Sequence, residues 1–247
     1  MPEQIFGRKI SRFDQVQSTN DLVRDAAEQG EAEGLVIAAQ EQLAGRGRMG
    51  RRWIVPRGTS LQCSILLRPP LAPQHASRLM QMAALAVART LERELHLQPT
   101  LKWPNDVLLD GKKVCGILTE SSIVGETLAY VILGIGLNVN YTMRAYPELA
   151  PFATTLQDVL GYAVELPCLE RALLHESDAL YARICNGESL VDEYRARLAM
   201  LGQPIRVLER GEILQGIAED VDADGALILK QDDTRVKLLA GDVTIIK

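Results

Sequence analysis

Short apolar runs, separated by glycine, proline and charged residues, dominate the first 140 residues and predict strands. Residues 35–39 and 60–67 form two such runs, the second ended by Pro69, and both predict buried strands. An Asp110-Gly111 pair between two later runs is typical of a β-hairpin, which indicates an antiparallel sheet. The strands predicted in this part cover residues 5–16, 35–39, 60–67, 100–102, 107–109, 113–120 and 128–140.

Apolar residues at three- and four-residue spacing predict helices between and after these strands. The first helix follows the polar cluster Ser18-Thr19-Asn20-Asp21, whose side chains suit an N-cap. The longest helical pattern runs from His75 to Leu97. The other helical stretches cover residues 154–161 and 168–199, the latter interrupted near Asn186-Gly187.

The pattern changes at Gly202-Gln203-Pro204, beyond which five short apolar runs alternate with turn residues. Such a series is typical of a small barrel-like β module. We therefore expect an α+β protein with two domains, residues 1–200 and residues 201–247. The strands predicted in the second domain cover residues 205–208, 213–218, 226–229, 236–239 and 243–246.

Charge is distributed unevenly along the 247 residues, whose net charge is −5. Residues 42–91 contain eight arginines and no Asp, Glu or Lys, so removing those eight charges leaves −13 for the rest. The glycine-rich stretch Gly45 to Trp53 concentrates this positive charge. Forked guanidinium donors suit phosphate or carboxylate, and glycines let a backbone approach a ligand closely. We expect a specific anion site here, and we expect no nucleic acid or membrane partner because the remainder is acidic.

The cellular compartment is indicated by what the sequence lacks. No apolar run approaches the roughly 20 residues that span a bilayer, and residues 1–4 do not begin a secretory leader. The four cysteines include no Cys-x-x-Cys pair, which fits reduced thiols. These features predict a cytoplasmic protein.

The stretch Gly45 to Gly50 fits the dinucleotide-binding pattern G-x-G-x-x-G, but its context does not. That fingerprint requires a helix that opens at the glycines and an acidic residue about 20 positions further on. Residues 53–58 do not open a helix, and the first acidic residue after the loop is Glu92. No Gly-Lys-Ser/Thr follows, so a P-loop is excluded as a match. The three histidines are scattered, so neither a zinc site nor a Ser-His-Asp triad is indicated.

Two further segments are candidates for ligand contact. Lys102-Trp103-Pro104-Asn105-Asp106 places an amide and a carboxylate on a turn that proline makes rigid, although a hairpin corner with Trp103 in the core also explains it. Gly134-Ile135-Gly136-Leu137-Asn138 is a strand with two positions free of side chains. Such positions occur where a ligand approaches closely, or at a β-bulge.

These segments occur together in the order and spacing of the biotin protein ligases, a family that the chain resembles from about residue 14 to residue 247. The pair Gly-Arg-Gly-Arg-x-Gly-Arg and Lys-Trp-Pro-Asn-Asp is specific to this family. The segments that carry the resemblance are Ser18-Thr19-Asn20, Gln42 with Gly45–Trp53, Lys102–Asp106, Lys113 with Gly116, and Gly134–Asn138.

The resemblance implies a catalytic domain like that of class II aminoacyl-tRNA synthetases, with a mixed, largely antiparallel sheet, and a small C-terminal SH3-like β-barrel. It implies an enzyme that joins biotin and ATP into biotinyl-5′-AMP and releases pyrophosphate. The biotinyl group then passes to a lysine of the biotin carboxyl carrier protein of acetyl-CoA carboxylase. ATP, Mg²⁺ and biotin would be required, with no permanently bound cofactor. We also expect the monofunctional type without an N-terminal DNA-binding domain, and a homodimer formed through sheet edges.

The resemblance also implies residue roles. Arg48 and Lys113 would be catalytic, and Asp106 would hold Mg²⁺. Biotin would contact Ser18, Thr19, Asn20, Gln42, Gly45, Arg46, Gly47, Arg48, Lys113, Gly116, Gly134 and Gly136. ATP or the adenylate would contact Arg46, Arg48, Arg51, Trp53, Asn105, Lys113 and Asn138. The glycine-arginine loop would close over the adenylate, which water destroys, and the segment containing Tyr146 and Phe152 would close the adenine side. Met49 stands where some relatives carry arginine.

Two alternatives differ in testable ways. A related ligase that uses lipoate would share the fold and the chemistry but not the paired motifs. A nucleic-acid-binding module would use the arginine-glycine stretch, but aromatic residues make up only 4% of the chain and offer few stacking platforms. Salt-dependent RNA or DNA binding that Arg46→Ala abolishes would favour that module.

Overall fold

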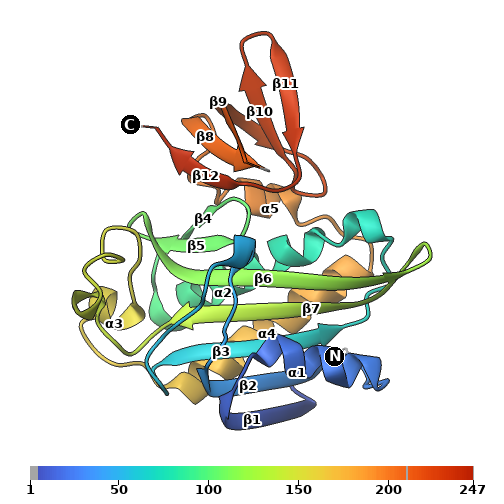
Figure 1. Cartoon of the computed structure of the whole chain (residues 1–247), viewed down its shortest axis with the longest axis vertical. Helices are drawn as coiled ribbons and strands as arrows, with labels where there is room; N and C mark the ends of the chain where they lie inside the picture. The colour runs from blue at the N-terminus through green and yellow to red at the C-terminus, as the bar shows by residue number, and fades with distance from the viewer. Residues whose placement is uncertain (1–4, 210, 247) are drawn as a thin grey trace.

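A computed structural model describes residues 5–209 and 211–246 of the chain, so the first four residues lie outside it. The larger part is built on a seven-stranded sheet (Figure 1). Its strands are β1 (Lys9–Val16), β2 (Leu35–Gln42), β3 (Ser60–Leu67), β4 (Thr100–Lys102), β5 (Asp106–Leu109), β6 (Lys112–Val124) and β7 (Thr127–Asn138). The helices are α1 (Thr19–Glu28), α2 (Arg78–Leu95), α3 (Leu156–Leu160), α4 (Leu166–Cys185) and α5 (Val191–Arg195). Short 3₁₀ turns lie at η1 (Arg48–Gly50), η2 (Pro73–His75) and η3 (Met143–Ala145).

The strand order is β1-β2-β3-β7-β6-β5-β4. β1 pairs with β2 in parallel, and every other neighbouring pair in this sheet is antiparallel. The mixed, largely antiparallel sheet is therefore confirmed. The hairpin predicted at Asp110-Gly111 is present, with φ of 49° and 73° at the two turn residues. The helix predicted from His75 begins later, at Arg78, because Pro73 starts a separate 3₁₀ turn first.

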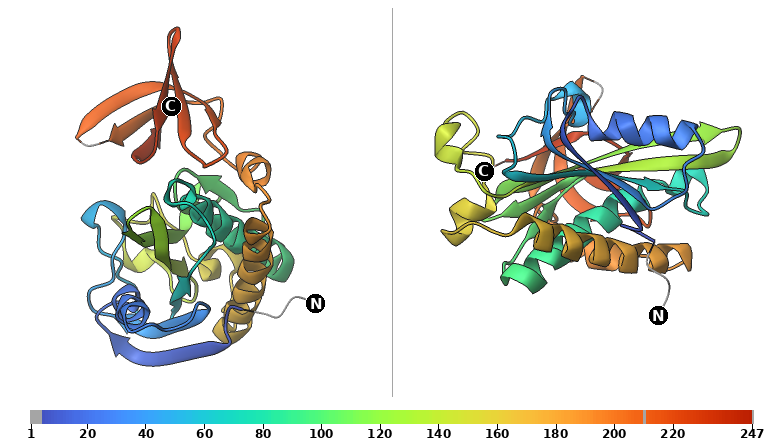
Figure 2. Two further views of the ribbon diagram at one scale, coloured as in Figure 1. Left: turned by 90° about the vertical axis from the view of Figure 1, so that its right-hand side faces the viewer. Right: turned by 90° about the horizontal axis from the view of Figure 1, so that it is seen from below.

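Helices cover both faces of the sheet (Figure 2). α2 and α4 pack on one face and build the larger core with residues such as Met82, Leu85 and Ile65. α1 covers the opposite face, where Val23 and Ala27 meet Leu66 in a smaller core. β3 lies between these layers, and all eight of its residues are buried. The helices leave uncovered the part of the sheet where β6 and β7 carry Gly116, Gly134 and Gly136, so a loop can form a site over these positions.

The C-terminal module is a five-stranded antiparallel sheet in the order β11-β10-β9-β8-β12. Its strands are β8 (Pro204–Glu209), β9 (Glu212–Val221), β10 (Leu227–Gln231), β11 (Thr234–Leu238) and β12 (Asp242–Ile245). All five predicted strands are confirmed, and residue 201 lies between α5 and β8. β11 and β12 occupy opposite edges of this sheet, so full closure into a barrel remains a prediction.

The module is joined to the larger part by specific contacts. The Trp103 side chain is buried, and its Nε1 donates to the Gly225 carbonyl at 2.8 Å. Asp224 accepts hydrogen bonds from His75 Nδ1 at 2.7 Å and from Arg78 Nε at 2.8 Å. Helices long and apolar enough to cross a membrane are absent from the part of the chain that the structure describes.

Candidate active site

A cavity of about 150 Å³ lies over the glycine positions of β6 and β7. The glycine-arginine loop, residues 42–53, covers it, the start of α1 forms one wall, and Asp242 of the C-terminal module closes another. Most of the residues predicted to form the site meet here. The predicted residues that line the cavity are Ser18, Thr19, Asn20, Gln42, Arg46, Gly47, Arg48, Arg51, Trp53, Asn105, Asp106, Lys113, Gly116, Gly134 and Gly136.

The loop is a tight backbone hairpin. Trp53 N donates to Gly45 O at 2.9 Å, and Gly47 N donates to Arg51 O at 2.7 Å. A Cβ at Gly45 would lie 2.6 Å from Trp53 O, so only glycine fits where the two arms cross. A single 3₁₀ turn follows the glycines. A dinucleotide site would need an α-helix at this position.

The floor of the pocket is an uncharged polar network. Gln42 Oε1 accepts hydrogen bonds from Thr19 N at 2.9 Å and from Thr19 Oγ1 at 3.1 Å. Gln42 Nε2 donates to Gln62 Oε1 at 3.0 Å. Ser64 Oγ lies 2.7 Å from Thr19 Oγ1 and 2.6 Å from Asn20 Oδ1. Hydroxyl and amide groups both donate and accept, so this floor suits a neutral ligand group that does the same.

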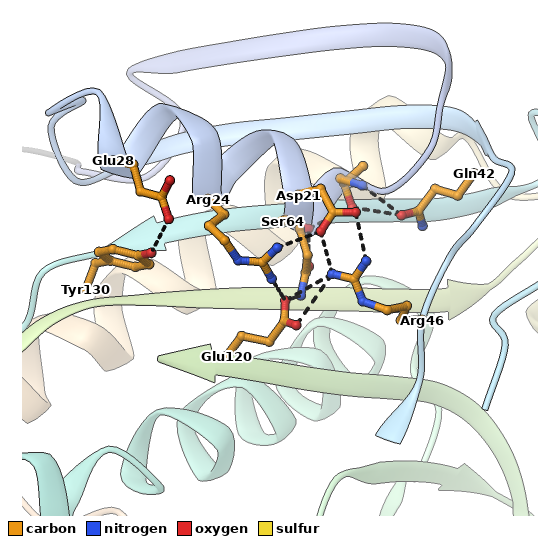
Figure 3. A network of polar contacts seen from close by, with 10 residues as sticks. Asp21, Arg24, Glu28, Gln42, Arg46, Ser64, Glu120 and Tyr130 are labelled. Atoms are coloured by element: carbon orange, nitrogen blue, oxygen red, sulfur yellow. Dashed lines mark hydrogen bonds and ion pairs between the residues drawn. The ribbon is translucent and has the colours of Figure 1, made fainter. Parts of the chain in front are cut away.

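Four charged side chains converge at the edge of the pocket, from α1, the loop and β6 (Figure 3). Arg46 donates to both oxygens of Asp21, at 2.8 and 2.7 Å, and lies 3.4 Å from Glu120 Oε1. Arg24 lies 2.8 Å from Asp21 Oδ1 and 3.0 Å from Glu120 Oε2. The hydrogen bond from Arg46 is the main reason that the pKa of Asp21 lies below its ordinary value of 3.8. Asp21 and Glu120 were not among the predicted site residues.

Arg48 differs from Arg46, because its partners are neutral. It donates to Asn105 Oδ1 at 3.1 Å and to Gly241 O at 3.2 Å. Among the described residues no carboxylate lies within ion-pair distance of it. Burial lowers the pKa of Arg48 from its ordinary 12.5, yet arginine stays protonated in proteins. The loop thus holds a partly buried cation that an anionic ligand can pair with.

Lys113 and Asp106 form an ion pair of 2.6 Å on the other side of the pocket. Asp106, Asn105 and Asp242 supply oxygen atoms of the type that Mg²⁺ prefers. No group of three or more potential ligands among His, Cys, Asp and Glu occurs in the described ranges. These residues therefore fit a Mg²⁺ ion that takes most of its ligands from substrate phosphates and water.

Two strand glycines make room for neighbouring side chains. A Cβ at Gly136 would lie 2.6 Å from the Trp53 ring, and a Cβ at Gly116 would lie 2.9 Å from Lys113 Nζ. Gly134 likewise makes room for Asn20, since a Cβ there would lie 2.5 Å from Asn20 Oδ1. Trp53 Nε1 is buried and has no partner among the described residues.

Two predicted residues lie outside this lining. Gly45 forms the base of the hairpin, and Asn138 is buried beside the pocket, where Nδ2 donates to Thr154 O at 3.1 Å. The segment that contains Tyr146 and Phe152 is tied to Lys113, whose backbone N donates to Phe152 O at 2.8 Å. Phe152 itself is 73% exposed. The predicted closing of the adenine side by this segment stays a prediction.

The sequence reasoning missed several residues of the site. Asp242 had been assigned to a turn between strands, and Glu120 to the end of a strand. Charge alone did not distinguish either from a solvated surface residue. The other residues of the cavity wall that were missed are Met49, Arg52, Cys63, Ile117, Leu118 and Ile135.

The chain matches two family models. Residues 12–138 match the Biotin/lipoate A/B protein ligase family, and residues 200–245 match the Biotin protein ligase C terminal domain. The chain is 36% identical over 243 residues to the biotin--[acetyl-CoA-carboxylase] ligase of Mycobacterium tuberculosis, covering 96% of this chain and 88% of that protein. It is 30% identical over 245 residues to the Bifunctional ligase/repressor BirA of Bacillus subtilis, covering 98% of this chain and 75% of that protein.

A solved structure has a similar fold. The biotin protein ligase from Aquifex aeolicus, in complex with biotin and ATP, superposes with a TM-score of 0.81. The match covers 97% of this chain and 99% of that one, at 24% sequence identity. The likeness extends over both the larger part and the C-terminal module.

Proposed function

The chain belongs to the biotin/lipoate A/B protein ligase family, and from that membership we propose how its pocket performs the ATP-dependent biotinylation of an acetyl-CoA carboxylase carrier protein. The enzyme joins biotin to ATP as biotinyl-5′-AMP with release of pyrophosphate. It then transfers the biotinyl group to a lysine amine of the carrier. The residue roles below are proposals that rest on the geometry of the pocket.

The polar floor receives the ureido ring of biotin. Thr19 and Gln42 offer donors and acceptors to a ring that has both, and Gly116 lets the ligand lie close to β6. Biotin's carboxylate then points toward Arg48 and Lys113. Trp53 lines the cavity where the adenylate's nucleotide side would pass.

Adenylate formation requires a carboxylate to attack the α-phosphate, so two anions must be held together against their repulsion. Arg48 and Lys113 are the cations that face this point. Lys113 can leave Asp106 for the ligand oxygens, which frees Asp106 toward a metal ion. Bound Mg²⁺ would neutralise phosphate charge. Donors already in place cost little reorganisation as charge develops on phosphorus.

The observation that carries this proposal is the environment of Arg48. A partly buried guanidinium with two neutral partners is stabilised when an anion arrives. The second step needs no protein nucleophile, because the acceptor lysine attacks the acyl carbon and AMP leaves. Cys63, the one cysteine of the cavity wall, is buried, and burial raises the pKa of its thiol, so it is unsuited to nucleophilic attack.

The test is biotin-dependent exchange of labelled pyrophosphate into ATP, with lipoate as the competing acid. We expect exchange with biotin and none with lipoate, followed by transfer of label from biotin to a carrier domain. Exchange with lipoate but not biotin would overturn the choice of substrate. Exchange with neither acid would overturn the proposed activity.

The proposal also covers the compartment, the partners, the cofactors and the oligomeric state of the enzyme. We place the enzyme in the cytoplasm, without nucleic-acid or membrane partners and without a permanently bound cofactor. A homodimer would form through β1, which pairs only with β2 in the described sheet and has its other edge open. Sedimentation with and without biotin would measure this association.

A further inference from the structure

Ser64 lies in β3 beneath the start of α1, next to the polar floor, but it is not one of the residues that line the cavity (Figure 3). Its side chain is buried. Ser64 Oγ lies 2.7 Å from Thr19 Oγ1 and 2.6 Å from Asn20 Oδ1. A hydroxyl has a single proton, so Ser64 can donate to only one of these two oxygens. That choice decides what Thr19 offers to a ligand.

The orientation of the Asn20 amide fixes the choice. Asn20 Nδ2 donates to Glu120 Oε2 at 2.6 Å, and the same carboxylate oxygen lies 3.0 Å from Arg24. An ionised carboxylate only accepts hydrogen bonds, so the NH₂ group of Asn20 faces Glu120 and its oxygen faces Ser64. Because an amide oxygen carries no proton, the contact between Ser64 and Asn20 needs the proton of Ser64. Ser64 therefore donates to Asn20.

The proton of Thr19 is then committed as well. The 2.7 Å contact between Thr19 and Ser64 needs a proton that Ser64 has already used, so the Thr19 hydroxyl supplies it. A second acceptor, Gln42 Oε1, lies 3.1 Å from the same hydroxyl. Whichever of the two receives the proton, it stays within the protein. Thr19 lines the cavity, and toward a ligand its oxygen therefore acts as an acceptor.

An acceptor at this position distinguishes between ring systems. The cyclic urea of biotin carries two N–H groups, either of which can donate to the Thr19 oxygen. A ring that places an oxygen or a sulfur there brings two acceptors face to face with no proton between them, and both lose their hydrogen bonds to water. A site built to receive an N–H group rejects the analogue that lacks it.

We propose that Ser64 is a positioning residue that makes the floor selective for the ureido ring. By donating to Asn20, it holds the Thr19 proton within the protein and keeps Thr19 as the acceptor for a ring N–H. The Glu120 carboxylate fixes the direction of this chain, in which Thr19, Ser64 and Asn20 each donate to the next group. The inference rests on the proposed ligase function and adds to it a residue that acts only through Thr19.

The test compares biotin with two cyclic carbamates, analogues in which a ring oxygen replaces one or the other ureido N–H. Dissociation constants are measured by calorimetry. We expect the unmodified enzyme to bind the carbamate whose oxygen faces Thr19 at least about tenfold more weakly than biotin, because two acceptors then meet. In Ser64→Ala the Thr19 hydroxyl can turn and donate to that oxygen, so the discrimination should fall at least about threefold. In pyrophosphate exchange Ser64→Ala should raise KM for biotin and leave kcat within about twofold, because the ureido ring is remote from the reacting carboxylate.

Ser177→Ala is the matched control, because Ser177 is an equally buried serine in α4. It should leave the discrimination and KM unchanged. Ser64→Cys keeps a weaker donor at the same place, so it should lose less discrimination than Ser64→Ala, and it replaces that variant if the alanine protein does not fold.

Two results would overturn the role of Ser64. One is equal binding of biotin and both carbamates by the unmodified enzyme. The other is a Ser64→Ala enzyme that discriminates as well as the unmodified one, including the case in which it binds all three ligands more weakly by the same factor. An unmodified protein that neither binds biotin nor exchanges pyrophosphate would instead overturn the proposed function.

Discussion

The two arginines of the loop motif, Arg46 and Arg48, differ in the charge of their partners. Arg46 has carboxylate partners, and Arg48 donates to an amide oxygen and a backbone carbonyl. A partly buried cation without a counter-ion is destabilising until an anion pairs with it. Arg48 is therefore the residue whose removal should affect chemistry more than folding.

Arg48→Ala and Lys113→Ala should each lower the rate of biotin-dependent pyrophosphate exchange at least about a hundredfold, because each removes a preorganised cation from the developing charge. Circular dichroism should be unchanged, since neither side chain contributes to the apolar cores. Arg57→Ala is the matched control: its side chain is 53% exposed and lies 3.6 Å from Asp14, outside the pocket. Exchange within threefold of the unmodified rate in either test variant would contradict the assigned roles.

At the scale of single residues the sequence identified most residues that line the cavity, but not their hydrogen-bond and ion-pair partners. Arg46 pairs with residues 25 and 74 positions away, and such pairs depend on strand register that no local pattern encodes. Asp21 was interpreted only as part of a helix cap. Asn138 Nδ2 donates to Thr154 O, and the predicted contact of Asn138 with the adenylate stays a prediction. Charged and amide residues on strands look alike in sequence whether they face a ligand, a partner or water.

Within the glycine-arginine loop, the surrounding backbone leaves no room for a side chain at Gly45 but leaves room for one at Gly47. At Gly45 an added Cβ would meet a backbone oxygen of Trp53 at 2.6 Å, while at Gly47 it would come no nearer than 3.5 Å to Arg51 O. The crossing of the two arms at Gly45, rather than flexibility throughout, fixes the hairpin.

Gly45→Ala should therefore loosen the loop and Gly47→Ala should not. The overpacked backbone contact in Gly45→Ala costs about 1–3 kcal/mol. This cost corresponds to a rise of roughly tenfold in the equilibrium constant for opening of the hairpin. The readout is hydrogen exchange of the Trp53 amide, which donates to Gly45 O. Equal protection of this amide in the two variants would show that the crossing does not control the hairpin.

Helices and strands with a clear hydrophobic period could be predicted from the sequence, but most of their ends could not. The bounds of β3, Ser60–Leu67, agree with the prediction because a mostly apolar run there is ended by Pro69. β6 extends to Val124, beyond its predicted end at Glu120, since it pairs with β7 along a hairpin arm that is largely polar and exposed. Pairing with a neighbour extends strands that their own side chains do not indicate.

On the scale of the whole molecule, the C-terminal module contributes to the stability of the larger part. Asp224 is desolvated there, which raises its pKa, but the hydrogen bonds from His75 and Arg78 outweigh burial and hold the pKa below the ordinary 3.8. A carboxylate with a lowered folded-state pKa stabilises the protein above the unfolded value, and this contribution is lost as pH falls through the folded value.

Asp224→Asn should lower the free energy of unfolding by about 1–2 kcal/mol at pH 7, because two hydrogen bonds to a charged acceptor are weakened. The difference from the unmodified protein should shrink as pH falls below about 4 and through the folded-state pKa of Asp224, which lies below 3.8. Urea midpoints at these pH values measure it. Asp233→Asn, an exposed change on the β10–β11 turn, is the control. A difference that persists unchanged at pH 3 would point to packing rather than charge.

The contact of the loop with Gly241 and Asp242 also has a consequence for how the protein is made. These partners leave the ribosome 193 and 191 residues after Arg48 and Arg51, a delay of roughly 10 to 40 seconds at ordinary elongation rates. A nascent chain can complete the seven-stranded sheet during that interval, yet it lacks the wall that its loop rests on. Only a chain that has been synthesised through β12 can make the contacts of Arg48 with Gly241 and of Arg51 with Asp242.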